Sequence, residues 1–131
     1  MTRAFESVRI AVTERRYGEK FAQMLEKQGA SVLHCPLIQE VPVEDAIGAR
    51  LFREICRNGP VDYIVFYTGV GVDFLFQSSE NPVIPPNAMI IARGPKAAAA
   101  LKRRGIRVDV NAEVPTTDGL IATLRRLPLS N

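Results

Sequence analysis

Two hydrophobic patterns alternate along the chain. Short apolar runs rich in β-branched residues predict buried strands at 8–12, 31–38, 61–67, 88–92 and 107–110. Between them, apolar residues recur every three or four positions, which predicts amphipathic helices at 17–27, 47–58, 69–77, 95–104 and 117–127. Strand and helix therefore follow one another in regular order from end to end.

Glycine and proline support these boundaries. Gly29 and Gly105 follow the first and fourth helices, where a residue that adopts a left-handed conformation ends a helix well. Pro95 suits the first turn of a helix, because it has no backbone N–H to leave unpaired. Residues 78–87 hold three prolines and predict a loop, whereas residues 31–43, with two prolines, resemble a crossover as much as a single strand.

Continuous apolar strands separated by helices are typical of a parallel sheet that is covered on both faces. Right-handed crossovers then predict a doubly wound, flavodoxin-like α/β fold with a five-stranded parallel sheet. We expect one α/β domain over 1–131, with a first βα unit at 1–30, an extended crossover at 31–43 and a main lobe at 44–131.

The composition is that of an ordinary globular domain. Of the 131 residues, 47% are hydrophobic and 24% are charged. The sequence lacks the run of about 18 apolar residues that a membrane span needs, and its first residues lack the features of a signal peptide. Because Cys35 and Cys56 do not make a disulfide framework, we expect a reduced, cytoplasmic protein without a membrane partner.

The net charge of +3 hides an asymmetry. Residues 1–87 carry 9 Lys/Arg and 11 Asp/Glu, whereas residues 88–131 carry 8 and 3. Arginine, which makes bidentate contacts with carboxylates and phosphates, supplies 13 of the 17 cations. The excess is either a solvated basic face or the site of a polyanion. Nucleic acid is a poor candidate, because Trp is absent and no stacking motif lies beside the basic residues.

In parallel α/β sheets, ligands bind beyond the carboxyl ends of the strands, where helix N-termini present unpaired N–H groups. The turns in this position are 12–16, 67–71, 92–96 and 114–119. Together they combine hydroxyls, glycines and four cations, namely Arg15, Arg16, Arg93 and Lys96. This combination suits a ligand with several carboxylates or phosphates.

Each turn also has a purely structural explanation. Gly69 and Gly71 can shape a tight strand-to-helix turn, and Thr116 or Thr117 can cap the last helix. The glycine pair is not a complete dinucleotide fingerprint, because Phe74 stands where a third glycine is needed. A nucleotide-binding flavodoxin-like domain therefore remains only a third alternative.

Metal and nucleophile chemistry has weak support. His34 and Cys35 are neighbours in a predicted strand and point to opposite faces, so they cannot hold one metal ion together. Cys56 lies on the apolar stripe of a helix and is expected to be a buried thiol. No metal site is predicted.

The turns resemble, in order, motifs of the uroporphyrinogen-III synthase family. Residues 66–72 (FYTGVGV) resemble its F-T-S-x-N-G-V segment, and residues 93–101 (RGPKAAAAL) resemble its V-G-P-x-T-A-x-A-L helix start. Residues 115–120 (PTTDGL) resemble its P-T-S-E-G-L cap, and the opening strand with Thr13 also fits. The resemblance covers nearly the whole chain but only the N-terminal half of the family.

The resemblance implies an enzyme that closes the linear tetrapyrrole hydroxymethylbilane, a polycarboxylate, into uroporphyrinogen III. The reaction is a dehydration with inversion of the last ring, and the family uses no cofactor or metal. The implied catalytic hydroxyls are Tyr67 and Thr68. The implied substrate-binding residues are Thr13, Arg15, Gly69, Val70, Gly71, Arg93, Gly94, Pro95, Lys96, Thr116 and Thr117.

Two features favour an alternative, a non-catalytic tetrapyrrole-binding or regulatory module of the same fold. Ala97 stands where the family often has a hydroxyl, and the family's second half is missing. In the family arrangement, residues 1–30 belong to a lobe whose remainder lies in that half. Their apolar face then needs cover from this chain's own sheet, from a partner chain equivalent to the second half, or from a second copy in a homodimer. That face comprises Val8, Ile10, Val12, Phe21, Met24 and Leu25. The prolines of 31–43 stiffen the segment and favour a homodimer in which the first βα unit is swapped.

Overall fold

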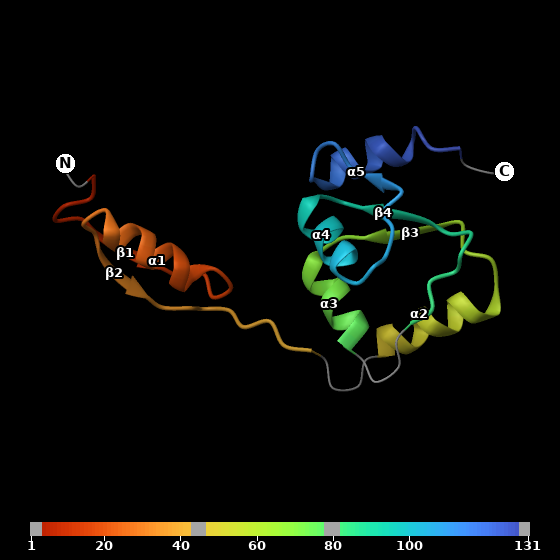
Figure 1. The fold of residues 1–131 in the computed structure, drawn as a ribbon, viewed down its shortest axis with the longest axis horizontal. Helices are drawn as coiled ribbons and strands as arrows, with labels where there is room; N and C mark the ends of the chain where they lie inside the picture. The colour runs from red at the N-terminus through yellow and green to blue at the C-terminus, as the bar shows by residue number, and fades with distance from the viewer. Residues whose placement is uncertain (1–3, 43–46, 78–81, 129–131) are drawn as a thin grey trace. The chain divides into compact units, whose positions relative to one another are not determined.

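The computed structural model describes residues 4–42, 47–77 and 82–128. The chain divides into two compact units, Met1–Pro42 and Val43–Asn131, and Figure 1 shows the elements of each. No helix in the described segments is long and apolar enough to cross a membrane.

The first unit consists of two parallel strands and one helix. The elements are β1 (Arg9–Val12), α1 (Gly18–Lys27) and β2 (Ser31–His34). The strands pair from Arg9↔Ser31 to Val12↔His34. Gly29, with a φ of 97°, ends the helix as expected. The second predicted strand, 31–38, is thus shorter in the structure, although the Leu37 N–H still donates to the Thr13 carbonyl at 3.2 Å.

Only one stripe of α1 is buried. Ala22 and Leu25 are buried, and Leu25 packs with Val12 of β1. Phe21 and Met24 remain 50% and 57% exposed. This unit by itself thus leaves part of the apolar face uncovered, because two strands about 5 Å apart are narrower than a helix about 10 Å across.

The second unit holds the remaining elements. They are α2 (Ile47–Asn58), β3 (Tyr63–Phe66), α3 (Gly69–Gln77), β4 (Met89–Ala92), α4 (Pro95–Arg103), β5 (Val110–Asn111) and α5 (Thr117–Leu124). The strands form a parallel sheet in the order β3-β4-β5. The predicted single five-stranded sheet is not confirmed, since the five strands lie in one two-stranded and one three-stranded sheet.

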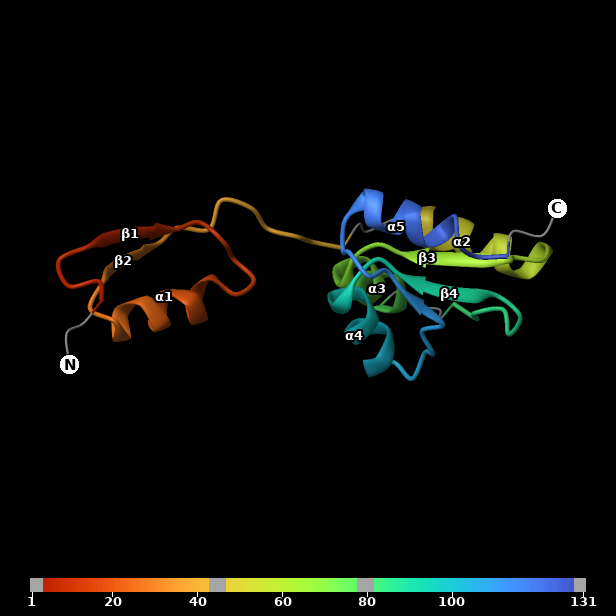
Figure 2. The same ribbon diagram turned by 90° about the horizontal axis from the view of Figure 1, so that it is seen from above.

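Helices cover both faces of the three-stranded sheet (Figure 2). On one face, Ile64 and Ile90 pack with Val72 of α3 and Leu101 of α4. On the other face, Ile91 packs with Leu120 of α5. This sandwich fixes the helix N-termini at the carboxyl ends of the strands, as the βα pattern predicts.

The helix α2 is covered on one side only. Phe52 and Cys56 pack against the cluster formed with α3 and α4, whereas Ile47, Leu51 and Ile55 are about half exposed or more. Cys56 is partly rather than fully buried, a correction to the prediction, and its partial burial raises the pKa of the thiol.

The last strand differs from the prediction of 107–110, because β5 spans only Val110–Asn111. Before β5, one backbone hydrogen bond remains, from the Asp109 N–H to the Ile90 carbonyl at 2.8 Å, and side chains supply further contacts. The Asp109 carboxylate accepts the Ile90 N–H at 2.6 Å, and Arg107 donates to the Ala88 carbonyl at 2.8 Å. Asp109 thus pairs with Ile90 twice, through its own N–H and through its carboxylate.

Candidate functional site

Three helix N-termini meet at the carboxyl end of the three-stranded sheet. A Cβ atom on Gly69, the first residue of α3, would lie 2.9 Å from the Lys96 carbonyl oxygen in α4. A Cβ atom on Gly94, just before α4, would lie 2.7 Å from the Cβ of Pro115 in the turn before α5. Glycine at both positions therefore lets the three turns approach one another closely.

Two of these helices carry their own caps. Thr68 Oγ1 accepts the Gly71 N–H at 3.0 Å, and Thr116 Oγ1 accepts the Gly119 N–H at 3.1 Å. Of the two threonines that could cap α5, Thr116 does so. The N-cap of α4 is Gly94, which offers no side chain for capping. The N-cap residue of α4 thus supplies no side-chain cap, and an uncapped helix N-terminus of this kind is an arrangement that suits an anion.

Tyr67 and Thr117 connect β3 to α5. The Tyr67 hydroxyl hydrogen-bonds the Thr117 hydroxyl, although fifty positions separate the two residues. On the same ring, the Arg93 guanidinium carbon lies 4.1 Å from the ring centroid. The hydrogen bond from Thr117, followed by the contact with Arg93, lowers the pKa of Tyr67. Its phenol is therefore a better proton donor than that of a free tyrosine.

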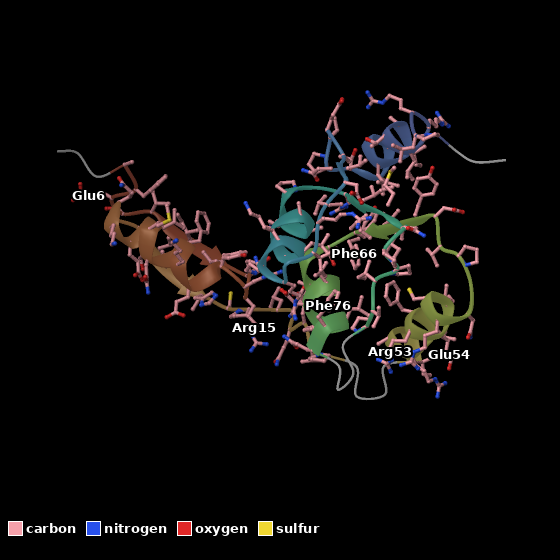
Figure 3. All side chains as sticks on the ribbon, turned by 45° about the vertical axis from the view of Figure 1, so that its right-hand side comes forward. Glu6, Arg15, Arg53, Glu54, Phe66 and Phe76 are labelled. Carbon is pink, nitrogen blue, oxygen red and sulfur yellow. The ribbon has the colours of Figure 1, made fainter. Side chains whose placement is uncertain are left out.

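The remaining predicted residues divide between the two units. Lys96 and Val70 belong to this edge of the sheet, on α4 and α3. Thr13 and Arg15 belong to the first unit and follow β1. Both are exposed, and Figure 3 shows Arg15 at the surface of its unit. Phe66, labelled in the same figure, is buried at the end of β3 and anchors the turn that carries Tyr67.

Sequence reasoning missed two contacts. It did not pair Tyr67 with Arg93, because only the β3–β4 register shows that these residues are neighbours beyond Phe66 and Ala92. It also gave His34 no role, yet the His34 Nε2 atom lies 2.8 Å from the Glu14 carbonyl and fixes the turn after β1.

Metal binding finds no support in the described residues. No group of three or more His, Cys, Asp or Glu side chains within them could hold a metal ion. The site instead offers backbone N–H groups, a guanidinium and hydroxyls, which suit an oxyanion.

The fold is that of an α/β protein with parallel sheets, and the carboxyl edge of such a sheet is where proteins of this class bind ligands. The family model described as uroporphyrinogen-III synthase HemD matches residues 19–130. The chain therefore belongs to the uroporphyrinogen-III synthase family, and the resemblance seen in the sequence is confirmed.

Known relatives agree with this assignment. An uncharacterized protein, YjjA, of Bacillus subtilis (strain 168) is 30% identical over 128 residues, covering 88% of this chain and 45% of the relative. The wild-type uroporphyrinogen III synthase of the extremely thermophilic bacterium Thermus thermophilus is 29% identical with a TM-score of 0.57, covering 95% of this chain and 49% of that one. A mutant form of the Thermus enzyme gives a TM-score of 0.66 at 29% identity, over 89% and 47% of the two chains. The chain spans about half the length of these relatives.

Proposed function

We propose that this chain is a uroporphyrinogen-III synthase, or one half of one, in tetrapyrrole biosynthesis. It would close hydroxymethylbilane into uroporphyrinogen III by dehydration with inversion of the last ring. Family membership supports the reaction. One observation supports the site above all: the N-termini of α3, α4 and α5 lie together beside Arg93.

The chemistry of this substrate fits the groups at the site. Its carboxylates suit Arg93, Lys96 and the uncapped N–H groups of α4. Tyr67, whose pKa is lowered, is the hydroxyl we propose as donor to the departing hydroxide. Thr68 already accepts the Gly71 N–H, so it stabilises the turn before α3 in addition to any hydrogen bond with the substrate. The rest of the catalysis is positioning of the two terminal rings.

The test is to supply hydroxymethylbilane to the purified chain and to resolve isomers I and III of the product. Isomer III above the spontaneous background is the expected result. Arg93→Ala should reduce its formation, and the matched control Arg125→Ala, at the far end of α5, should not. Formation of isomer I alone, at the spontaneous rate, would show that the lone chain is inactive.

The second candidate function is a non-catalytic tetrapyrrole-binding or regulatory module. It is favoured by the length of the relatives, of which this chain covers 45% and 49%. In this case uroporphyrin binds and Arg93→Ala weakens the binding, but hydroxymethylbilane is not converted. Both functions therefore predict that a tetrapyrrole binds, and only the first predicts that hydroxymethylbilane is converted.

A partner for the first unit is part of the proposal. The exposed apolar side chains of α1, together with Leu33 on the open face of β2, need cover that two strands and one helix do not supply. We propose a second copy of this chain as that partner, with a separate second-half chain as the other possibility. The free thiols Cys35 and Cys56 support a reduced, cytoplasmic setting.

A further inference from the structure

Arg93 has a different kind of partner from other arginines of the second unit, which form ion pairs. Arg103 and Arg104 both reach Asp73, and Arg107 reaches Asp109. In the part of the chain that the structure describes, no carboxylate pairs with Arg93. Its partner is instead Tyr67. The guanidinium carbon lies 4.1 Å from the ring centroid, and a side-chain hydrogen bond with Thr117, followed by one with Arg93, lowers the pKa of the Tyr67 phenol. This guanidinium is half-buried without a counter-ion among the described residues, and it lies where the family's substrate is proposed to bind.

The stacked geometry determines what Arg93 can do. A guanidinium held against an aromatic face directs its N–H groups outward in its own plane. That plane presents two parallel donors, which match the two oxygens of a carboxylate. Stacking also removes rotamer freedom in advance, so less entropy is lost when the carboxylate binds.

Tyr67 is itself held in place. Tyr67 comes directly after the buried Phe66 of β3, and its hydroxyl hydrogen-bonds Thr117 at the start of α5. The backbone N–H of Arg93 donates to the Phe66 carbonyl at 3.0 Å, which aligns the two residues on adjacent strands. The order of support is therefore Thr117, then Tyr67, then Arg93.

We propose that Arg93 is a receptor for one carboxylate of the ligand, and that Tyr67 and Thr117 are positioning residues that hold its guanidinium in the binding orientation. The proposal rests on the tetrapyrrole function above and names the group that this site recognises, a flexible alkyl carboxylate. It assigns the Tyr67 ring a role separate from any proton donation by its hydroxyl.

The first experiment measures binding of uroporphyrin to the full chain through the absorbance of the porphyrin, with thermal melting as the check on folding. Arg93→Ala and Tyr67→Leu should each weaken binding by about tenfold, the scale of one charge-assisted contact. Tyr67→Phe keeps the ring but loses the hydroxyl that bonds Thr117, so it should weaken binding measurably, though less than Tyr67→Leu. Arg93→Lys keeps the charge and should not restore affinity. The double variant Arg93→Ala with Tyr67→Leu should be no weaker than either single change.

The second experiment needs no tetrapyrrole. Sodium propionate is added to the ¹⁵N-labelled chain, and the side-chain Nε–H signals of arginine are followed by NMR. The Arg93 signal should shift and saturate with propionate, and it should do so less with phosphate at equal ionic strength. The signal of Arg125 serves as the control and should stay in place.

The outcomes distinguish the carboxylate receptor at Arg93 from the proposed tetrapyrrole function. If wild type binds uroporphyrin and Tyr67→Leu binds it equally well, the positioning role is overturned and the tetrapyrrole function stands. If wild type fails to bind uroporphyrin but propionate shifts Arg93, the carboxylate receptor stands and the proposed function falls. If propionate leaves the Arg93 signal unchanged, the receptor is overturned.

Discussion

Gly119→Ala is the sharpest test of the turn that precedes α5. Gly119 is the third residue of that helix, and its N–H is held by Thr116 at 3.1 Å. A Cβ atom on Gly119 would lie 2.7 Å from the Cβ of Val114 and would overlap the Val114 carbonyl oxygen. Because that oxygen belongs to the backbone, no change of rotamer relieves the overlap.

The two effects of the added methyl group have opposite signs. Alanine in place of glycine within a helix stabilises a protein by about 0.5–1 kcal/mol. Overpacking costs about 1–3 kcal/mol, and loss of an N-cap adds about 1 kcal/mol. We therefore expect Gly119→Ala to lower the free energy of unfolding by about 1–3 kcal/mol. It should also weaken uroporphyrin binding, because Thr117 moves with the turn.

Gly48→Ala is the matched control. Gly48 is also a helical glycine of the second unit, and a Cβ atom there would meet nothing within 4 Å among the described residues. It should raise stability by up to about 1 kcal/mol. Urea unfolding of both variants gives the midpoints, compared at constant m. A Gly119→Ala midpoint at or above that of wild type would refute the close approach at this turn.

The remaining predictions concern charge and assembly. The Ile90 N–H, and then Arg107, lowers the pKa of Asp109, so its carboxylate stabilises the fold at neutral pH and loses this effect as the pH falls through the lowered pKa. Asp109→Ala should therefore cost about 1–2 kcal/mol at neutral pH and less in acid, measured by urea unfolding, and an equal loss at both pH values would contradict the account. Thr117→Val should raise the pKa of Tyr67 in a spectrophotometric titration of tyrosinate, and an unchanged titration would show that the hydrogen bond is absent in solution. Light scattering after size exclusion should give a mass above that of one chain, and a single-chain mass from dilute to concentrated samples would contradict the proposed homodimer.

The sequence predicted the order of elements because each depends on local pattern. Apolar runs and helical spacing placed every strand and helix within a few positions, and Gly29 and Pro95 marked boundaries that the structure confirms. Parallel pairing followed from continuous apolar strands separated by helices, and both sheets confirm it. The candidate site was placed at the carboxyl ends of the strands by the same topology, and it stays a prediction.

The contacts within the site depended on information that a local pattern does not hold. Tyr67 and Thr117 are fifty positions apart, and their contact requires the sheet register and the crossing of α5 over β4. In the sequence, Arg93 was a cation beside a helix start with a binding role implied by the resemblance, and nothing local paired it with Tyr67. Its stacking on Tyr67 depends on β3 and β4 ending side by side at Phe66 and Ala92.

On α1 and α2, the apolar spacing predicts covered helix faces, whereas the structure leaves part of each face exposed. The helical spacing of Phe21 and Met24 on α1, and of Ile47, Leu51 and Ile55 on α2, is as regular as that of buried positions, yet all five side chains are about half exposed or more. An amphipathic pattern records every surface that a helix covers, whether within one chain or with a partner. Leaving one such side chain in water forgoes about 1.5–3 kcal/mol. Because the relatives are about twice as long as this chain, we interpret both stripes as surfaces that further polypeptide covers, which is the physical basis of the proposed partner.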